Sequence, residues 1–303
     1  MTTDLNPLTG RPADCLRKSR SNSPIHSTNF SFRNRTVSLS AADPAAGRRL
    51  ASLLGLRAAP PGPADHLLML RETARGLEIQ SDDNVRHVVD LDAAIASLAQ
   101  SIPYWLLPHQ VSHVLHAGAI VVDGLAHLFM GPGYAGKSTL ALEAWLMGHE
   151  VMGDDYLILD PATLTVRAAP KPIKVRRPSR SLPVRLEPVL APDHYCMGRL
   201  GEEWALLLGR QLPRQTPLES ELPIGSVHFL QRVDGATVAS RPVRASEFYQ
   251  LIFHQLVTAP LDNLDVPRSF APLLAGGRIF SLGVGTDATP LAVDAILAHR
   301  ALV

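Results

Sequence analysis

The sequence predicts an α/β fold built on a mixed sheet, with its core around a phosphate-binding loop. An apolar run at 125–130 precedes a glycine-rich stretch at 131–139, and an amphipathic helical pattern follows over 140–148. The dipeptide Asp123-Gly124 separates two apolar runs, which indicates a hairpin because both residues tolerate a positive φ. Hairpins mixed with helices along the chain favour a sheet with strands in both directions.

The glycine-rich stretch fits G-x-x-x-x-G-K-S/T, the pattern of a P-loop. Glycines let the backbone approach an anion, and successive N–H groups form a concave nest for phosphate oxygens. The lysine would reach the β- and γ-phosphates of a nucleotide, and the serine hydroxyl would take Mg²⁺. A turn without a ligand has no use for these two side chains. The predicted nucleotide-binding residues are Gly131, Gly133, Tyr134, Ala135, Gly136, Lys137, Ser138 and Thr139.

The N-terminal third predicts a tail and a small separate region. Residues 1–34 are polar and predict a disordered tail. Residues 35–100 predict a small α/β region without a catalytic set, which leaves 101–303 as the P-loop domain. The expected elements of the small region are strands at 35–39, 67–71, 76–80 and 86–89, a helix at 44–56 capped by Asp43, and a helix at 91–100 capped by Asp90 or Asp92.

Two neighbouring carboxylates follow the P-loop helix. Residues 150–159 read as a strand that carries Asp154 and Asp155. Adjacent carboxylates beside an apolar run are costly unless something neutralises them, and a bound Mg²⁺ would do so. The alternative is an exposed pair at a turn. Their position soon after a P-loop favours the metal.

Charge runs, turn dipeptides and helix caps predict the remaining elements. The segment at 171–185 is basic and rich in proline, which favours a solvated loop, with a grip on phosphates or on an acidic substrate as the alternative. The irregular stretch at 186–222 is a candidate lid or substrate loop over the site. The other expected elements are helices at 102–116, 202–208, 246–257 and 289–300, a strand at 278–282, and a second hairpin in which Asp234-Gly235 joins 227–232 to 237–241.

Composition excludes several classes of protein. A net charge of +1 offers no field to attract nucleic acid or an anionic membrane. No apolar stretch approaches the ~18 residues of a membrane span, and the first ten residues lack the apolar core of a signal peptide. Cys15 and Cys196 lie far apart and match no metal spacing, which suits a reducing compartment. These features predict a cytoplasmic protein without a nucleic-acid or membrane partner.

Three blocks in order resemble the C-terminal catalytic domain of HPr kinase/phosphorylase, and HPr-kinase-like proteins of biosynthetic clusters in particular. They are the stretch from His116 to Gly124, the P-loop, and Gly148-His149 followed by the two aspartates. The tight match covers about 116–160, a looser likeness extends to the C-terminus, and residues 1–100 are not matched. The resemblance implies a fold like that of phosphoenolpyruvate carboxykinase. It also implies ATP- and Mg²⁺-dependent phosphorylation of a serine hydroxyl on a peptide or protein, such as a lasso-peptide precursor.

The resemblance also implies residue roles. Lys137 and Ser138 would hold the phosphates and Mg²⁺, and His116 would sit near the γ-phosphate. Asp154 would be the general base and Asp155 a metal ligand, although the resemblance does not separate these two roles. The family's second signature, a Leu-Glu-Ile-Arg-Gly-like stretch, is absent. Basic residues stand there instead, which argues against HPr as substrate and against a reverse phosphorylase reaction. They suggest a hypothesis in which Lys171, Lys174 and Arg176 read an acidic leader peptide.

Other functions on the same motifs stay open. A small-molecule kinase would share the scaffold, and a regulatory module could bind nucleotide without catalysis, although binding alone needs fewer groups than His116 and two aspartates. A GTPase is disfavoured because no Asn-Lys-x-Asp motif occurs, and a transporter ATPase because no Leu-Ser-Gly-Gly-Gln-like stretch occurs. A homo-oligomer is also left open.

Overall fold

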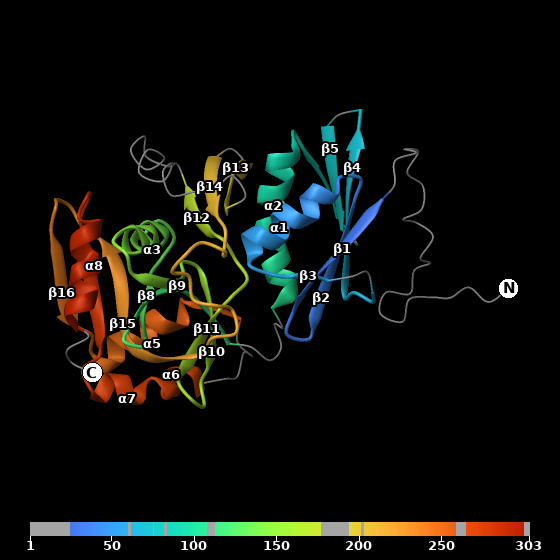
Figure 1. Ribbon diagram of the computed structural model, residues 1–303. Coiled ribbons are helices and arrows are strands. Elements are labelled where there is room, and N and C mark those ends of the chain that lie inside the picture. The colour runs from blue at the N-terminus through green and yellow to red at the C-terminus, as the bar shows by residue number, and fades with distance from the viewer. Residues whose placement is uncertain are drawn as a thin grey trace.

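The computed structural model arranges the chain around three β-sheets and the helices that pack on them. The six-stranded sheet and the nine-stranded sheet lie on opposite sides of the molecule, and the three-stranded sheet lies between them (Figure 1). The structure describes residues 25–59, 62–74, 76–81, 84–107, 113–176, 194–200, 203–258 and 265–299.

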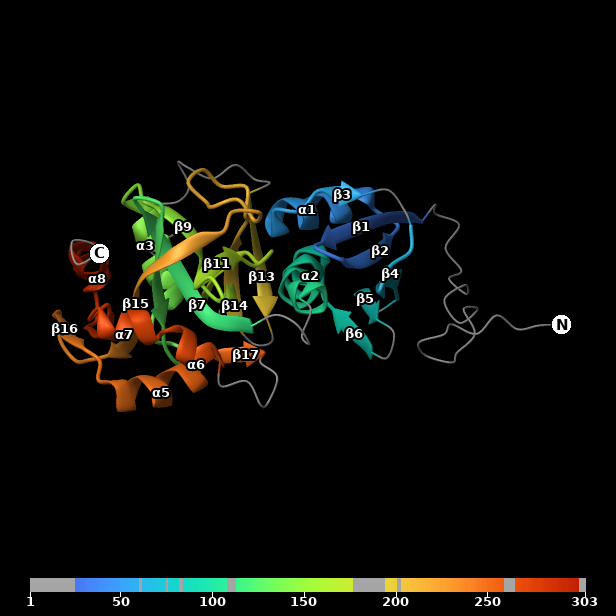
Figure 2. The same cartoon turned by 90° about the horizontal axis from the view of Figure 1, so that it is seen from below.

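The six-stranded sheet contains the first strands of the chain, in the order β3-β1-β2-β4-β5-β6. Helices α1 and α2 cover one of its faces, and each begins at a predicted cap: Asp43 accepts from Ala45 N at 2.8 Å and Asp90 from Ala93 N at 2.7 Å (Figure 2). The elements are β1 (His26–Phe32), β2 (Arg35–Ala41), α1 (Pro44–Leu54), β3 (Ala58–Ala59), β4 (His66–Thr73), β5 (Gly76–Ser81), β6 (Asn84–Val88) and α2 (Leu91–Leu106).

Two predicted boundaries in this region are wrong. The predicted tail of 1–34 is too long, because β1 pairs with β2 and buries Phe30 and Phe32, while residues 1–24 lie outside the described part of the chain. The boundary between residues 100 and 101 falls inside α2. This helix packs on the six-stranded sheet with one face and on strand β13 (Tyr195–Leu200) with the other. The second contact is so tight that a Cβ on Gly198 would lie 2.7 Å from Ala96 Cβ. The change in the hydrophobic pattern near residue 100 therefore does not mark a domain boundary.

The nine-stranded sheet is mixed, as predicted. Strand β15 runs parallel to β8 and β18, whereas β7, β8, β10 and β11 pair antiparallel. The predicted hairpin of β7 and β8 is confirmed, with Asp123 at φ 51° and Gly124 at φ 77°. The strands are β7 (His113–Val122), β8 (Leu125–Met130), β9 (Glu150–Gly153), β10 (Tyr156–Asp160), β11 (Thr165–Ala168), β15 (Leu222–Arg232), β16 (Val238–Pro242), β17 (Leu256–Thr258) and β18 (Ile279–Val284).

Helices cover both faces of this sheet. Helices α3 and α8 pack on one face with Phe129 and Leu230, while α5, α6 and α7 pack on the other with Leu128 and Phe229, as the two-residue period of a strand requires (Figures 1 and 2). The helices are α3 (Lys137–Leu146), α5 (Ala245–Phe253), α6 (Asp265–Ser269), α7 (Ala271–Ala275) and α8 (Thr289–Ala298). No helix in the described ranges is long and apolar enough to cross a membrane.

The second predicted hairpin is wrong. Strands β15 and β16 flank Asp234-Gly235, but β18 lies between them and pairs with both. Strand β18 is buried along its whole length, which suits a central strand, whereas β16 is mostly exposed, which suits an edge. A turn signal is local and cannot reveal a strand that enters from 40 or more residues later in the chain.

Four further predictions change at short apolar runs. The predicted strand over 150–159 is two strands, β9 and β10, with the aspartates between them. The predicted helix over 202–208 is strand β14 (Glu203–Leu208), paired with β12 (Ile173–Arg176) and β13 (Tyr195–Leu200). The predicted helix over 102–116 is the end of α2 and the start of β7, and that over 246–257 ends at Phe253 and gives way to β17. Periodicity does not separate short apolar helices from strands.

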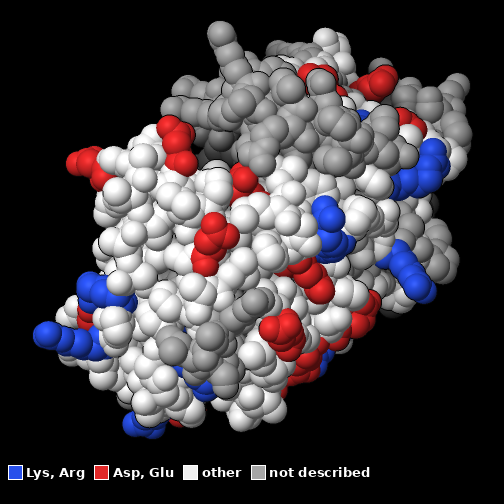
Figure 3. Space-filling model, turned by 60° about the vertical axis from the view of Figure 1, so that its left-hand side comes forward, with Lys and Arg blue, Asp and Glu red and all other residues white. Residues whose placement is uncertain are grey.

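Figure 3 shows how charged side chains lie on one face of the molecule. On the face drawn in Figure 3, basic and acidic residues are scattered among uncharged ones. This matches the net charge of +1.

Candidate active site

The P-loop connects β8 to α3 and packs against β15. A Cβ on Gly131 would lie 2.8 Å from the Leu230 carbonyl oxygen, so the entrance to the loop needs a glycine. Gly136 adopts φ +100° immediately before α3, a backbone conformation that favours glycine. No side chain caps α3, because its N-cap is Gly136. The first N–H groups of this helix therefore remain available to an anion.

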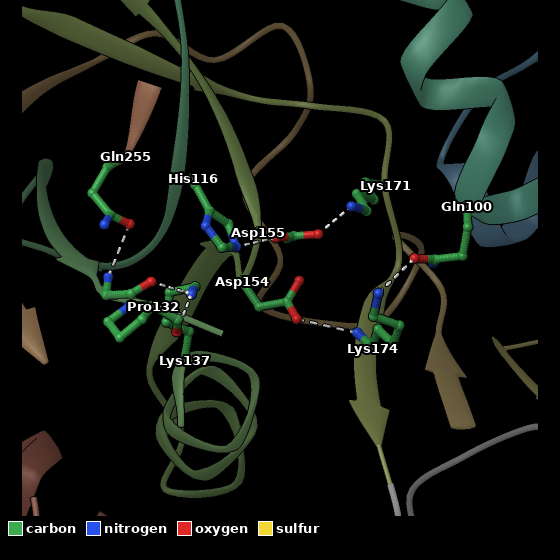
Figure 4. A network of polar contacts seen from close by, with 10 residues as sticks. Gln100, His116, Pro132, Lys137, Asp154, Asp155, Lys171, Lys174 and Gln255 are labelled. Atoms are coloured by element: carbon green, nitrogen blue, oxygen red, sulfur yellow. Dashed lines mark hydrogen bonds and ion pairs between the residues drawn. The ribbon is translucent and has the colours of Figure 1, made fainter. Parts of the chain in front are cut away.

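Lys137 lies at the base of the loop. Its Nζ donates to the carbonyl oxygens of Gly131 at 2.6 Å and Pro132 at 3.2 Å, and the side chain is 7% exposed (Figure 4). Burial lowers the pKa of Lys137, and the charges of Asp155 and Asp154 partly offset this effect. The ammonium is thus held by carbonyl groups that a phosphate could replace.

Strand β7 positions the two aspartates. Both β9 and β10 pair with β7, so the chain turns between them at Asp154 and Asp155. A Cβ on Gly118 would lie 2.4 Å from the Gly153 carbonyl oxygen, and only a glycine in β7 allows this approach. The register also pairs His116 with Tyr156, the residue after the second aspartate. The predicted neighbourhood of His116 and the aspartates thus follows from strand pairing.

Asp155 is bound by two basic side chains. Its Oδ1 lies 2.8 Å from His116 Nε2, and its Oδ2 accepts from Lys171 Nζ (Figure 4). Burial by itself would raise the pKa of Asp155. The hydrogen bond from His116 and the charge and hydrogen bond of Lys171 outweigh burial and hold this pKa far below its usual range. Asp155 is therefore an ionised carboxylate.

Asp154 has a different environment. It is 3% exposed, the Ser138 side chain hydrogen-bonds to it, and its Oδ2 accepts from Lys174 N at 3.2 Å. Burial and the neighbouring charge of Asp155 raise the pKa of Asp154, and these hydrogen bonds only partly offset the rise. Of the two aspartates, Asp154 is thus the one in contact with the predicted metal-binding serine.

Sequence reasoning missed the roles of Lys171 and Lys174. Lys171 is 7% exposed, lies 3.6 Å from the ring centroid of Tyr156 and is paired with Asp155, so a solvated loop is the wrong description of this residue. Residues 177–185 of the predicted loop lie outside the described part of the chain. Lys174 donates through its backbone to Asp154 and through Nζ to Gln100 Oε1 at 3.1 Å. Both lysines thus already bond within the protein, and the hypothesis that Lys171, Lys174 and Arg176 read an acidic leader stays a prediction. The cluster of basic residues around Pro170 and Pro172 was the available signal. A sequence pattern of this kind does not show whether the side chains point into the protein or into solvent.

These residues line one cleft of about 530 Å³. Its charged side chains comprise four cations and two carboxylates. An excess of positive charge suits a nucleotide polyphosphate. The lining residues are Gln100, His116, Gly133, Tyr134, Ala135, Gly136, Lys137, Ser138, Thr139, Asp154, Asp155, Tyr156, Lys171, Lys174, Val175 and Arg232.

The donor set of this cleft fits Mg²⁺ rather than a metal held by protein alone. Among the residues that the structure describes, no group of three or more His, Cys, Asp or Glu could hold a metal ion. Mg²⁺ is usually bound by one or two carboxylates together with waters and substrate phosphates. A hydroxyl at Ser138 beside the carboxylate of Asp154 is such a set. The residues present therefore fit Mg²⁺ that arrives with a nucleotide.

Comparison with known proteins gives a distant likeness in fold. No protein-family model and no curated protein matches the sequence. Among solved structures, the chain is similar to the HPr(Ser) kinase/phosphatase from Coxiella burnetii, with 12% sequence identity, coverage of 62% of this chain and 96% of that chain, and a TM-score of 0.30. This likeness is too distant to assign an activity, so the functional argument rests on the cleft.

Proposed function

We propose that this chain is an ATP-dependent phosphotransferase that uses Mg²⁺ and phosphorylates a serine hydroxyl of a peptide or protein. The observation that carries the proposal is the meeting of a P-loop lysine with two carboxylates of unequal environment, Asp154 buried and Asp155 partly buried, in one cleft. A module that only bound nucleotide would need the P-loop but not the pair of carboxylates. Pairs of titratable groups whose environments push their pKa values apart are typical of acid–base sites.

In the proposed reaction, the bond between the terminal phosphorus and the oxygen of ADP breaks as a bond to the acceptor oxygen forms. The acceptor's proton passes to a carboxylate of the cleft. Lys137 exchanges its carbonyl partners for phosphate oxygens, and the N–H groups at the start of α3 bind the same phosphates. Ser138 and an adjacent aspartate would hold Mg²⁺, which would neutralise part of the phosphate charge.

The contacts support a division of roles opposite to the one implied by the family resemblance. Asp154 contacts the Ser138 side chain, which supports Asp154 as the metal-side carboxylate. Asp155 is held in place by His116 and Lys171 at the side of the cleft that His116 lines, which supports Asp155 as the group that accepts the hydroxyl proton. We therefore assign His116 and Lys171 to orienting Asp155. The acceptor would approach from the side of the cleft that His116 lines.

A transfer experiment tests this function directly. The full chain is incubated with ATP, Mg²⁺ and a library of serine-containing peptides, including acidic leaders with a terminal serine, and the products are examined by mass spectrometry. Gain of one phosphate on serine is the expected result. Lys137→Ala should reduce transfer by a factor on the order of a hundred or more, because the phosphate charge loses its fixed partner.

Two controls sharpen the outcome. An acceptor peptide in which the serine is replaced by alanine should gain no phosphate. Phosphate that appears on a small alcohol but on no peptide would replace the peptide substrate with a small-molecule one. If calorimetry with ATP and Mg²⁺ detects no binding, the phosphotransferase proposal fails.

A further inference from the structure

Arg232 lies beside the P-loop at the end of a neighbouring strand. Strands β8 and β15 run parallel, with Met130 opposite Phe229, so their carboxyl ends reach the same edge of the sheet. The P-loop leaves that edge after Met130, and β15 extends along it as far as Arg232. Ligands of open α/β sheets bind at this edge. Arg232 accordingly lines the same cleft as Lys137.

The pleat of β15 directs Arg232 toward the start of α3. Side chains two residues apart share a face of the sheet, and Leu230 packs on the face that α3 covers. Arg232 continues beyond Leu230 on that face. A Cβ on Gly136 would lie 3.7 Å from one terminal nitrogen of Arg232, so the guanidinium lies next to the N-cap of α3.

The charge of Arg232 lacks a partner within the described chain. Three other arginines near this sheet are paired within the protein: Arg167 binds Glu221, Arg241 binds Glu247 and Arg210 donates to two carbonyl oxygens. Arg232 makes no hydrogen bond or ion pair with any residue that the structure describes. It lies instead at the positive end of a helix dipole and in the same cleft as Lys137. An anion bound between these groups would interact favourably with each of them.

We propose that Arg232 is a second phosphate-binding residue of the cleft and donates to the non-bridging oxygens of the nucleotide's polyphosphate. The inference rests on the proposed function and deepens it. Lys137 supplies a point charge at the base of the loop, whereas a guanidinium supplies a planar pair of donors suited to phosphate. Together they hold the polyphosphate from two sides of the P-loop: Lys137 from its base and Arg232 from β15.

Binding measurements on the full chain test this role without turnover. Isothermal titration with MgATP and with magnesium tripolyphosphate, which has no base or sugar, would compare the wild type with Arg232→Ala and Arg232→Lys. Arg232→Ala should weaken both ligands by roughly ten- to a hundredfold, as the loss of charge-assisted hydrogen bonds requires. Arg232→Lys should recover part of the loss. Arg241→Ala, which breaks an exposed ion pair on β16, is the matched control and should bind as the wild type does.

Each contrary result has a distinct meaning. Wild-type affinity of Arg232→Ala for tripolyphosphate overturns the inference and leaves the proposed function intact. A loss for MgATP but not for tripolyphosphate also overturns it, because Arg232 would then contact the base or sugar. If the wild type binds neither ligand, the proposed function and the inference fail together. Thermal unfolding without ligand should be the same for all variants, because Arg232 is exposed.

Discussion

Two adjacent aspartates illustrate how single residues of one sequence type acquire different chemistry. Asp155 faces His116 and Lys171, whereas Asp154 faces Ser138 and a backbone N–H. The two residues are adjacent in the sequence, so the difference between their pKa values comes from the groups that the fold places beside each side chain. In a buried site, where charges interact strongly, these partners move the pKa values of the two carboxyl groups in opposite directions.

The proposed roles predict different responses to magnesium. Asp154→Asn should abolish the gain in ATP affinity that Mg²⁺ provides, because this variant loses the carboxylate next to Ser138. Asp155→Asn should keep that gain and lose phosphoryl transfer. Titration calorimetry with ATP, in the presence of Mg²⁺ or of a chelator, measures the effect. If Asp155→Asn is the variant that loses the gain, the roles are the reverse.

A buried histidine predicts how stability depends on pH. His228 is fully buried and hydrogen-bonded to Ser226 at 2.8 Å; burial first, then the charges of His299 and His127, lower its pKa well below the usual value. The unfolded chain therefore binds more protons than the folded chain below pH ~6.5, and stability should fall there by up to about 1.4 kcal/mol per pH unit.

Urea unfolding at several pH values measures this slope. His228→Gln should reduce it, since the substituted side chain does not titrate. His254→Gln, at an exposed position, is the control and should leave the slope unchanged. Equal slopes in the wild type and His228→Gln would assign the acid sensitivity to another group.

At the scale of elements, β12 joins the N-terminal helix α2 to the aspartates. The backbone N–H of Lys174 binds Asp154, and its ammonium binds Gln100 of α2 (Figure 4). One residue thus contacts the carboxylate pair and the six-stranded-sheet region at once. The N-terminal region is therefore part of the support of the cleft, although the family resemblance does not cover it.

Loss of the hydrogen bond between Lys174 and Gln100 should affect turnover more than nucleotide affinity. Gln100→Leu removes the acceptor of Lys174 while keeping a similar side-chain size, and we expect kcat to fall by roughly three- to tenfold, as for one lost hydrogen bond. The KM for ATP should change little, because the P-loop is untouched. Ser101→Ala, in the same helix, removes a hydrogen bond to Ser97 and should leave kcat unchanged. Equal kinetics of Gln100→Leu and the wild type would contradict the link.

At the scale of the whole molecule, one apolar core joins the N-terminal region to the nine-stranded sheet. A single cluster of buried side chains includes Leu50 of α1, Ile95 of α2 and Leu128 of β8. The helix α2 packs on both sides, with the six-stranded sheet on one and β13 on the other (Figure 2). A region of this size gains its stability from that shared burial.

The shared core predicts one cooperative unfolding transition. Scanning calorimetry of the full chain should show a single peak, and Leu50→Ala and Leu128→Ala should each shift it downward by an amount that corresponds to about 2–5 kcal/mol. Both positions are fully buried. Two separate peaks, with each variant moving a different one, would show that the N-terminal region is an independent domain.

Sequence reasoning was most successful where neighbours in the chain decide the structure. The β7–β8 hairpin, the glycines of the P-loop and the Asp43 and Asp90 caps depend on φ values and hydrogen bonds within a few residues. Nearly all predicted site residues line one cleft for the same reason, because the P-loop and the aspartates each form a local turn beside β7.

Pairings between distant segments had to await the tertiary structure. They include the insertion of β18 between β15 and β16, the strand at 203–208, the burial of Lys171 against Asp155, and the approach of Arg232 to Gly136. By itself the sequence determined the local turns and the types of chemical group that surround them. The tertiary structure decided which charges meet, because burial and long-range strand order depend on segments that no local pattern connects.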